Sequence, residues 1–185
     1  MEETQNSIGK FLDPNKIISQ LDVTSGSVVV DFGCGPGYFS IPFARAVGED
    51  GHVYALDVLP QALETVLSRA KNSSVANIET KRVNFEKERG TKLENDLADW
   101  VILKDVLFQN KKKDIVIAEV YRVLKDGGKV LVIEWNQKES SVGPAMEIRV
   151  PQSDTEKIFR EQKFIIEKEI IAGDFHYGFV ATKSC

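Results

Sequence analysis

Short apolar strands alternate with helical segments along most of this chain. Five segments have the length and the β-branched, apolar composition of strands, and they cover residues 27–32, 52–57, 78–84, 99–105 and 129–135. The segments between them carry apolar residues at spacings of three and four, as helices do, in residues 38–48, 59–72 and 114–128. A strand, a helix and a second strand in this order form a parallel pair, so the pattern predicts an α/β fold with a doubly wound sheet and helices on both faces.

The two ends of the chain add further elements. Residues 13–21 predict a helix with Asp13 as its cap and a proline at its first position, and the tail predicts a helix followed by two strands. Residues 136–152 form a long loop of mixed composition, which is typical of a functional segment. No linker divides the chain, so we expect one domain over residues 1–185, with residues 1–24 as a helical lid and 136–152 as a substrate loop.

Composition makes several classes of protein less favoured. The 185 residues carry a formal net charge of −4, which disfavours nucleic acid as a partner. The polar N-terminus does not resemble a signal peptide, and no apolar run approaches the ~18 residues that would span a bilayer. Cys34 and Cys185 lie far apart, so neither a disulfide framework nor a cysteine-rich metal site is predicted. We therefore expect a cytoplasmic protein without a membrane span, and the sequence does not indicate its oligomeric state.

The stretch "DFGCGPGYFS", residues 31–40, follows the first strand and holds three glycines, Gly33, Gly35 and Gly37. In an open α/β sheet a nucleotide rests against this first strand-to-helix turn, where glycine permits positive φ and removes the Cβ that would keep a ligand from the backbone. Asp57 ends the second strand, where a carboxylate can accept hydrogen bonds from both hydroxyls of a ribose.

The spacing of the glycines does not fit a nicotinamide dinucleotide. That fingerprint is G-x-G-x-x-G, and the sixth position is Tyr38 when the pattern starts at Gly33 and Ser40 when it starts at Gly35. Asp31, two residues before the first glycine, would repel a pyrophosphate. This position suits a ligand that carries a positive charge.

The motifs resemble those of a known family. "VVVDFGCGPGYFS" followed by "VYALDV" resembles motif I and the next acidic motif of the class I S-adenosylmethionine-dependent methyltransferases, and "RVLKDGGKVLVIEW" resembles the segment that enters their fifth strand, with Asp126 in place of a usual proline. The resemblance covers about residues 11–183 and is nearest to the compact type 11 and type 25 members. It implies a Rossmann-like sheet of seven mostly parallel strands, the last of them antiparallel, and transfer of a methyl group from S-adenosylmethionine to a small or medium-sized acceptor, with S-adenosylhomocysteine as product.

The resemblance also implies site residues. Carried over position by position, the residues that would bind the cofactor are Asp31, Gly33, Gly35, Gly37, Asp57, Val58, Asn84, Phe85 and Lys104. Asn84 stands where the family often has an acid that accepts from the adenine amino group, a contact that an amide carbonyl can also make.

Candidates for catalysis and for the acceptor lie at the carboxyl edge of the predicted sheet. If a general base is needed, the candidates are His176, Asp105 and Glu134. Arg149 in "VGPAMEIR" and Tyr177 in "FHYG" correspond to segments that similar methyltransferases carry near the substrate. No "NPPY"-like run follows the fourth strand, which disfavours methylation of nucleic acid bases, and no metal site is predicted.

Two other classes stay open at this point. A nicotinamide-dependent oxidoreductase would use a similar sheet, although the broken glycine pattern and Asp31 count against it. A non-catalytic module that binds S-adenosylmethionine without turnover would explain why Asn84, Phe108 and Asp126 differ from the residues usual in the family.

Overall fold

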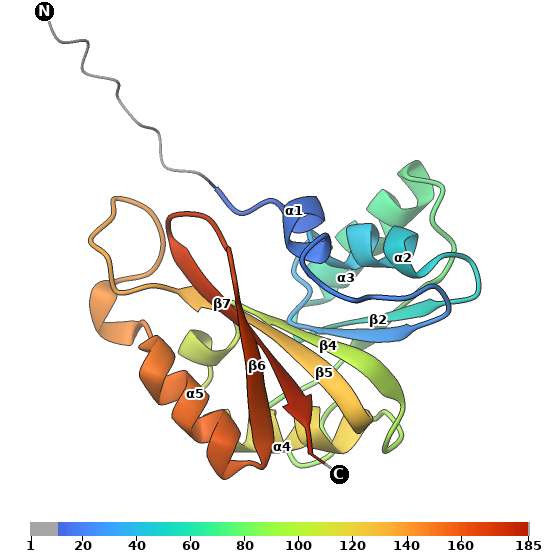
Figure 1. The fold of residues 1–185 in the computed structure, drawn as a ribbon. Coiled ribbons are helices and arrows are strands. Elements are labelled where there is room, and N and C mark those ends of the chain that lie inside the picture. Colours follow the sequence, from blue (N-terminus) through green and yellow to red (C-terminus); the bar gives the residue numbers. More distant parts are fainter. Residues whose placement is uncertain (1–10, 185) are drawn as a thin grey trace, which may run out of the picture.

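The computed structural model describes residues 11–184, so residues 1–10 of the predicted lid and Cys185 lie outside the described part. One sheet of seven strands forms the centre, in the order β3-β2-β1-β4-β5-β7-β6 (Figure 1). The strands are β1 (Val28–Phe32), β2 (His52–Asp57), β3 (Ile78–Arg82), β4 (Ala98–Lys104), β5 (Leu124–Trp135), β6 (Phe164–Ile170) and β7 (His176–Lys183).

Strand direction follows the prediction. β1 pairs in parallel with β2 and β4, and the parallel pairs β2 with β3 and β4 with β5 extend the sheet on both sides. β7 runs antiparallel to both of its neighbours, β5 and β6. The predicted α/β fold, a mostly parallel seven-stranded sheet whose last strand is antiparallel, is therefore confirmed.

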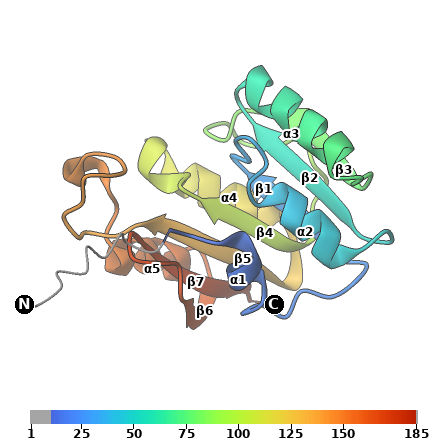
Figure 2. The same ribbon diagram turned by 90° about the horizontal axis from the view of Figure 1, so that it is seen from above.

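Within residues 11–184, five α-helices cover the two faces of the sheet. They are α1 (Pro14–Ile18), α2 (Ser40–Val47), α3 (Pro60–Asn72), α4 (Lys113–Val123) and α5 (Gln152–Glu161). Successive strand residues point to opposite faces. Val29 accordingly packs in a core with Phe43 of α2, while Val30 packs in a second core with Ile117 of α4. Seen from above, α1 and α2 lie on the other side of the sheet from α4 and α5 (Figure 2).

The largest difference from the predicted boundaries lies before the fifth strand. The helical segment predicted over residues 114–128 ends at Val123 as α4, and β5 already begins at Leu124. Leu124 is buried and pairs with Ala98 of β4, so its contacts favour extended backbone. The glycine at 127, with φ +73°, then continues the strand through a conformation that other residues rarely adopt.

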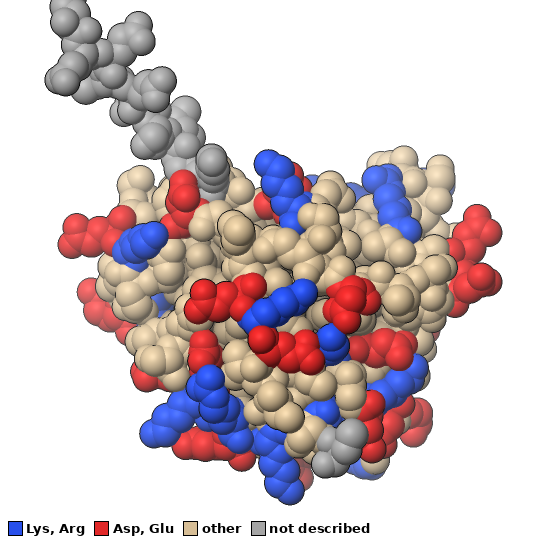
Figure 3. Space-filling view, in the orientation of Figure 1, with Lys and Arg blue, Asp and Glu red and all other residues tan. Residues whose placement is uncertain are grey.

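The surface carries charges of both signs. On the face formed by β6 and β7, Lys and Arg lie between Asp and Glu, and neither sign dominates (Figure 3). Within residues 11–184, no helix has the length and apolar character needed to cross a membrane.

Candidate functional site

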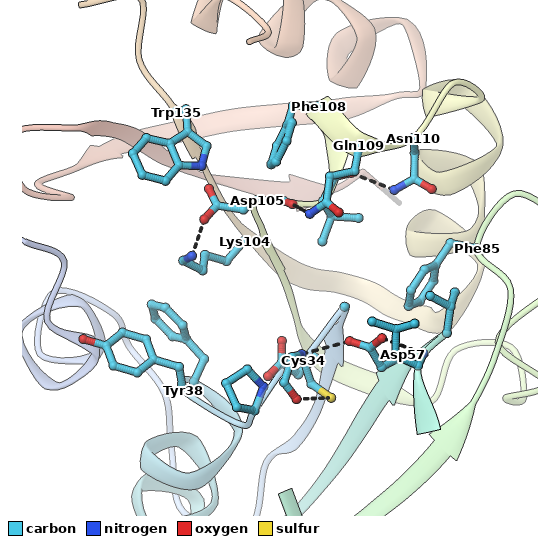
Figure 4. Close-up of a pocket in the computed structure, with 18 residues that line it drawn as sticks. Cys34, Tyr38, Asp57, Phe85, Lys104, Asp105, Phe108, Gln109, Asn110 and Trp135 are labelled. Atoms are coloured by element: carbon cyan, nitrogen blue, oxygen red, sulfur yellow. Dashed lines mark hydrogen bonds and ion pairs between the residues drawn. The ribbon is translucent and has the colours of Figure 1, made fainter. Parts of the chain in front are cut away.

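A cleft of about 530 Å³ lies at the carboxyl ends of the parallel strands β1, β2, β4 and β5. This volume is within the range of sites for small molecules and cofactors. Figure 4 shows two groups of side chains facing each other across it. We call residues 31–39, 57–59 and Phe85 the glycine half, and residues 104–110 with Trp135 the β4 half.

The glycine turn has the backbone that its sequence predicts. Gly33, Gly35 and Gly37 have φ values of +69°, +50° and +80°. The N–H groups of Gly33 and Cys34 both donate to the carbonyl of Leu56, at 2.8 and 2.9 Å, which fastens the turn to β2. A Cβ added at Gly35 would meet no protein atom within 4 Å, so this backbone is open to a ligand. Gly37 does not line the cleft. Its N–H donates to the backbone carbonyl of Cys34 at 3.0 Å, which closes the turn.

Asp57 is fixed at the end of β2 and lines the cleft. Its Oδ2 accepts from the N–H of Gly35 and its Oδ1 from the N–H of Leu59, both at 2.9 Å. Each carboxylate oxygen has a second lone pair, so Asp57 can still accept from a vicinal diol. Val58, 44% exposed, lies beside it on the cleft wall.

Asp31 places a second carboxylate below the same turn. Its side chain is buried and accepts from the hydroxyl of Ser40 at 2.6 Å. Burial raises the pKa of Asp31 to about 6, with the charge of Asp57 adding to the effect and the Ser40 hydrogen bond opposing it. Asp31 is therefore mainly ionised at neutral pH, and together with Asp57 it favours a cationic group in this half of the cleft.

Asn84 and Phe85, the two cofactor-binding residues predicted at the end of the third strand, differ in their positions relative to the cleft. Phe85 lines the cleft and its ring stacks on Phe32 at a centroid distance of 5.2 Å. Asn84 is exposed and is absent from the cleft lining, because its side-chain carbonyl accepts from the N–H of Glu86 at 3.0 Å and closes a local turn. The Asn84 side chain therefore does not line the cleft in this structure, and its contact with the adenine stays a prediction.

Charged side chains meet in the β4 half. Lys104 forms an ion pair with Asp105 Oδ2, and both residues line the cleft (Figure 4). The other oxygen, Oδ1, lies 3.3 Å from Nε2 of His176, whose ring packs on Trp135 at a centroid distance of 4.2 Å. Asp105 adopts φ +57°, an uncommon conformation for a residue with a side chain. Such strain is often found at functional sites.

Glu134 does not face the cleft, which corrects its prediction as a possible base. Its side chain is completely buried, and Oε1 accepts from the N–H of Leu107 at 2.6 Å. Burial raises the pKa of Glu134 to about 8. The carboxyl group is therefore mainly protonated at neutral pH, and it fixes the short 3₁₀ turn η1 (Leu107–Gln109) that carries Phe108 into the cleft.

The two predicted substrate residues also lie outside the cleft lining. Tyr177 is partly buried, and its hydroxyl lies 2.7 Å from the hydroxyl of Thr155 on α5 and donates to the carbonyl of Val150 at 3.0 Å. Arg149 is 6% exposed, and its guanidinium binds atoms of its own loop. Both residues hold the segment between β5 and α5 in place, and neither points into the cleft.

Several residues of the cleft were missed from the sequence. Tyr38, Phe39, Phe108 and Trp135 contribute aromatic lining. The Tyr38 hydroxyl also donates to the carbonyl of Leu12 at 2.7 Å, which brings the N-terminal segment to the edge of the glycine half. Their positions, directly after the glycine turn and at the carboxyl ends of β4 and β5, are the signal that could have indicated them.

Among residues 11–184, no group of three or more His, Cys, Asp and Glu side chains is arranged to hold a metal ion.

Comparison with known proteins agrees with the motifs. The family described as methyltransferase domain matches residues 23–173. The chain is 31% identical over 126 residues to the ubiquinone/menaquinone biosynthesis C-methyltransferase UbiE of Marinomonas sp., an alignment that covers 68% of this chain and 49% of that protein. It is 35% identical over 119 residues to the demethylmenaquinone methyltransferase of Bacillus mycoides, covering 63% and 48%. The chain thus spans about half the length of these relatives.

Solved structures share the fold. A SAM-dependent methyltransferase from Aquifex aeolicus has a TM-score of 0.86 at 21% identity, covering 94% of this chain and 90% of that one. Phosphoethanolamine N-methyltransferase 2 of Haemonchus contortus, solved in complex with S-adenosyl-L-methionine, has a TM-score of 0.75 at 18% identity, covering 93% and 52%. The resemblance indicated by the sequence motifs is confirmed.

Proposed function

This chain belongs to the family of S-adenosylmethionine-dependent methyltransferases, and on that premise we propose that it methylates a small hydroxylated aromatic acceptor, such as a quinol. The main support for this proposal is the composition of the cleft. The open glycine turn with the carboxylates of Asp31 and Asp57 faces an aromatic wall that holds one carboxylate, Asp105. The relatives named as quinone C-methyltransferases support an acceptor of this class.

The glycine half fits the cofactor. Asp57 would accept from the ribose hydroxyls, Val58 and Phe85 would lie against the adenine, and Gly33 and Gly35 would pass beneath the methionine part. Asp31 would favour the positive charges of the amine and sulfonium. When bound, S-adenosylmethionine supplies a methyl group on a positively charged sulfur, which is a good leaving group.

The β4 half fits the acceptor. The aromatic rings of Phe108 and Trp135 lie on one side of the cleft and Tyr38 on the other (Figure 4). A planar ring can stack between such walls and leave one edge toward polar groups. Lys104 belongs to the same half, and its charge is balanced by Asp105.

Asp105 is the proposed general base. It is the one base candidate from the sequence that both lines the cleft and keeps an oxygen close to a second titratable group, since Oδ1 lies 3.3 Å from His176 Nε2. A hydroxyl of the acceptor would give its proton to Asp105, which makes the acceptor a stronger nucleophile. The acceptor would then bond to the methyl carbon as the methyl–sulfur bond breaks, and S-adenosylhomocysteine would leave with the electron pair of that bond. His176, behind Asp105, would orient the carboxylate. Most of the acceleration would come from alignment of the reactants with water excluded, a contribution of about 7–11 kcal/mol.

We further propose a small-molecule acceptor rather than nucleic acid. Residues 1–24, of which the structure describes 11–24, would act as a lid, and residues 136–152 would act as the substrate loop. A cytoplasmic location remains a prediction of the sequence.

Ligand binding and methyl transfer test the proposal in turn. Calorimetric titration with S-adenosylhomocysteine and with NADH should detect binding of the first ligand only, and that ligand should raise the melting temperature. Tritium transfer from methyl-labelled S-adenosylmethionine is then measured with a panel of benzenediols and naphthalenediols kept reduced, with amines and thiols as comparison acceptors. Asp105→Asn should slow transfer at least tenfold while its affinity for S-adenosylhomocysteine stays within twofold of the native value.

The outcomes separate the three classes of function. Binding of NADH in place of S-adenosylhomocysteine would indicate an oxidoreductase. Binding of S-adenosylhomocysteine without transfer to any acceptor would indicate a non-catalytic module. Transfer to amines or thiols alone would contradict the hydroxylated aromatic acceptor.

A further inference from the structure

Arg149 uses every hydrogen-bond donor that it has within its own loop. Nε donates to Pro144, the first terminal nitrogen to Asn136 and Lys138, and the second to Ser140 and Val142, at 2.9–3.2 Å. A guanidinium has five N–H donors, so none is left for a substrate. Four of the acceptors are backbone carbonyls and the fifth is the hydroxyl of Ser140. Residues 136–149 therefore fold around the guanidinium.

This arrangement is costly for a loop that only connects two elements. Arg149 is 6% exposed, and its five acceptors are all neutral. A buried cation loses much of its hydration energy, and neutral acceptors recover part of it. A loop that merely joined β5 to α5 could do so with exposed polar residues.

This loop, residues 136–149, contacts Trp135, which lines the cleft. Gly143 lies against the indole, since a Cβ added there would approach Cζ3 to 2.5 Å, and the Arg149 guanidinium carbon lies 5.6 Å from the ring centroid. His176 packs on the same indole at 4.2 Å. Trp135 is therefore held between the loop and the histidine that approaches Asp105.

We infer that Arg149 is a positioning residue for the β4 half: by closing residues 136–149 around itself it fixes Trp135, and through Trp135 it fixes His176 beside Asp105. The inference rests on the proposed function for its consequence in acceptor binding, but the positioning itself is a property of the free protein. The glycine half has its own supports in Leu56 and Ser40, so it does not depend on this loop.

Nuclear magnetic resonance tests the positioning without any acceptor. The chain has two tryptophans and two histidines, so fluorotryptophan labelling gives one signal for Trp135 and one for Trp100, and the imidazole spectrum gives His176 and His52. Trp100 and His52 lie at the other end of the sheet's strands and serve as internal references. The variants are Arg149→Lys, which keeps the charge but has three donors, and Gly143→Ala, which adds the clashing Cβ.

Both variants should shift or broaden the Trp135 and His176 signals and leave those of Trp100 and His52 in place. Affinity for S-adenosylhomocysteine should stay within twofold of the native value. In contrast, kcat/KM for an acceptor that the native protein methylates should fall at least tenfold. Arg160→Met, which removes an exposed arginine paired with Glu156 on α5, is the matched control and should change none of these.

Unchanged Trp135 and His176 signals in both variants would overturn the inference. So would an equal loss of affinity for S-adenosylhomocysteine, which would mean that the loop supports the whole fold. If the native protein methylates no acceptor, the proposed function fails, but the signals still decide the inference about Arg149.

Discussion

The glycine half of the cleft comes mainly from two short stretches that follow β1 and β2, whereas the β4 half joins the stretch after β4 to Trp135 of β5 and is supported from behind by His176 of β7. In the glycine half, the backbone of the turn and the carboxylates of Asp31 and Asp57 supply the polar surface, and apolar side chains such as Val58 and Phe85 lie beside them. In the β4 half, side chains from β4, β5 and β7 meet, and Asp105 approaches His176.

This difference explains how each half can change. A surface made of backbone depends on conformation, so it requires glycine at fixed positions but is indifferent to many other side chains. A surface made of side chains can be altered by single substitutions while the fold stays the same. The glycine half should therefore bind one ligand throughout the family, and the β4 half should decide which acceptor is used.

The largest effect is expected from Asp57→Ala. Loss of the carboxylate removes the proposed ribose acceptor and the hydrogen bonds from Gly35 and Leu59. Affinity for S-adenosylhomocysteine, measured by calorimetry, should fall by about 1.5–3 kcal/mol, the usual value for a charged hydrogen-bond partner. Asp99→Ala is the control, because Asp99 also accepts from a backbone N–H, that of Val28, but lies away from the cleft. Equal affinities of the two variants would place the ribose elsewhere.

A pair of glycine substitutions separates backbone strain from ligand contact. Gly35 and Gly127 have φ values of +50° and +73°, and an added Cβ meets no protein atom within 4 Å at either position. Alanine at each should therefore cost a similar ~1–2 kcal/mol in the free energy of unfolding, the cost of a left-handed residue with a Cβ. Affinity for S-adenosylhomocysteine should fall only for Gly35→Ala, because only Gly35 lines the cleft. A comparable loss with Gly127→Ala would show that strain acts at a distance.

The sequence was a good guide to the sheet and to the glycine half because both depend on local patterns. Strands of alternating or continuous apolar residues set the core, and the spacing from Gly37 to Asp57 is fixed by one helix and one strand. The misplaced side chains are those whose hydrogen-bond partners the sequence does not indicate, whether the partner lies in a distant segment or in the same loop. Nothing near Glu134 in the sequence indicates that it accepts from Leu107, and nothing near Arg149 indicates that its loop folds back around it.

Glu134→Gln tests whether the buried Glu134, which holds the 3₁₀ turn η1 of the β4 half through Leu107, is protonated in the folded protein. The test measures how stability depends on pH. The pKa of Glu134 is raised to about 8 in the folded protein, above its value of 4.5 when exposed. Between these values the unfolded chain loses the proton that the folded chain keeps, so this group lowers the free energy of unfolding as pH rises, by up to about 1.4 kcal/mol per pH unit. Its favourable contribution is complete below pH 4.5.

Urea unfolding from pH 6.5 to 8 should therefore show Glu134→Gln gaining stability relative to the native protein as pH rises. Glu119→Gln is the control. The pKa of Glu119 is lowered in the fold, by hydrogen bonds from Arg122 and Thr91 that outweigh the opposing effect of burial. That carboxylate is ionised in both states above pH 6.5, and its loss should lower stability without changing the slope. Parallel curves for Glu134→Gln and the native protein would contradict a protonated Glu134.

The smallest effect, expected from Asn84→Ala, is the sharpest check on where the glycine half ends. The Asn84 side chain closes a turn with Glu86 outside the cleft, so its removal should cost no more than about 0.5 kcal/mol of stability and leave affinity for S-adenosylhomocysteine within twofold. Val58→Ala offers a comparison of similar size inside the cleft, where loss of apolar contact should weaken binding roughly fourfold. If Asn84→Ala weakened binding more than Val58→Ala, the turn after β3 would have to rearrange when the ligand binds. The glycine half would then depend on side chains in the same way as the β4 half.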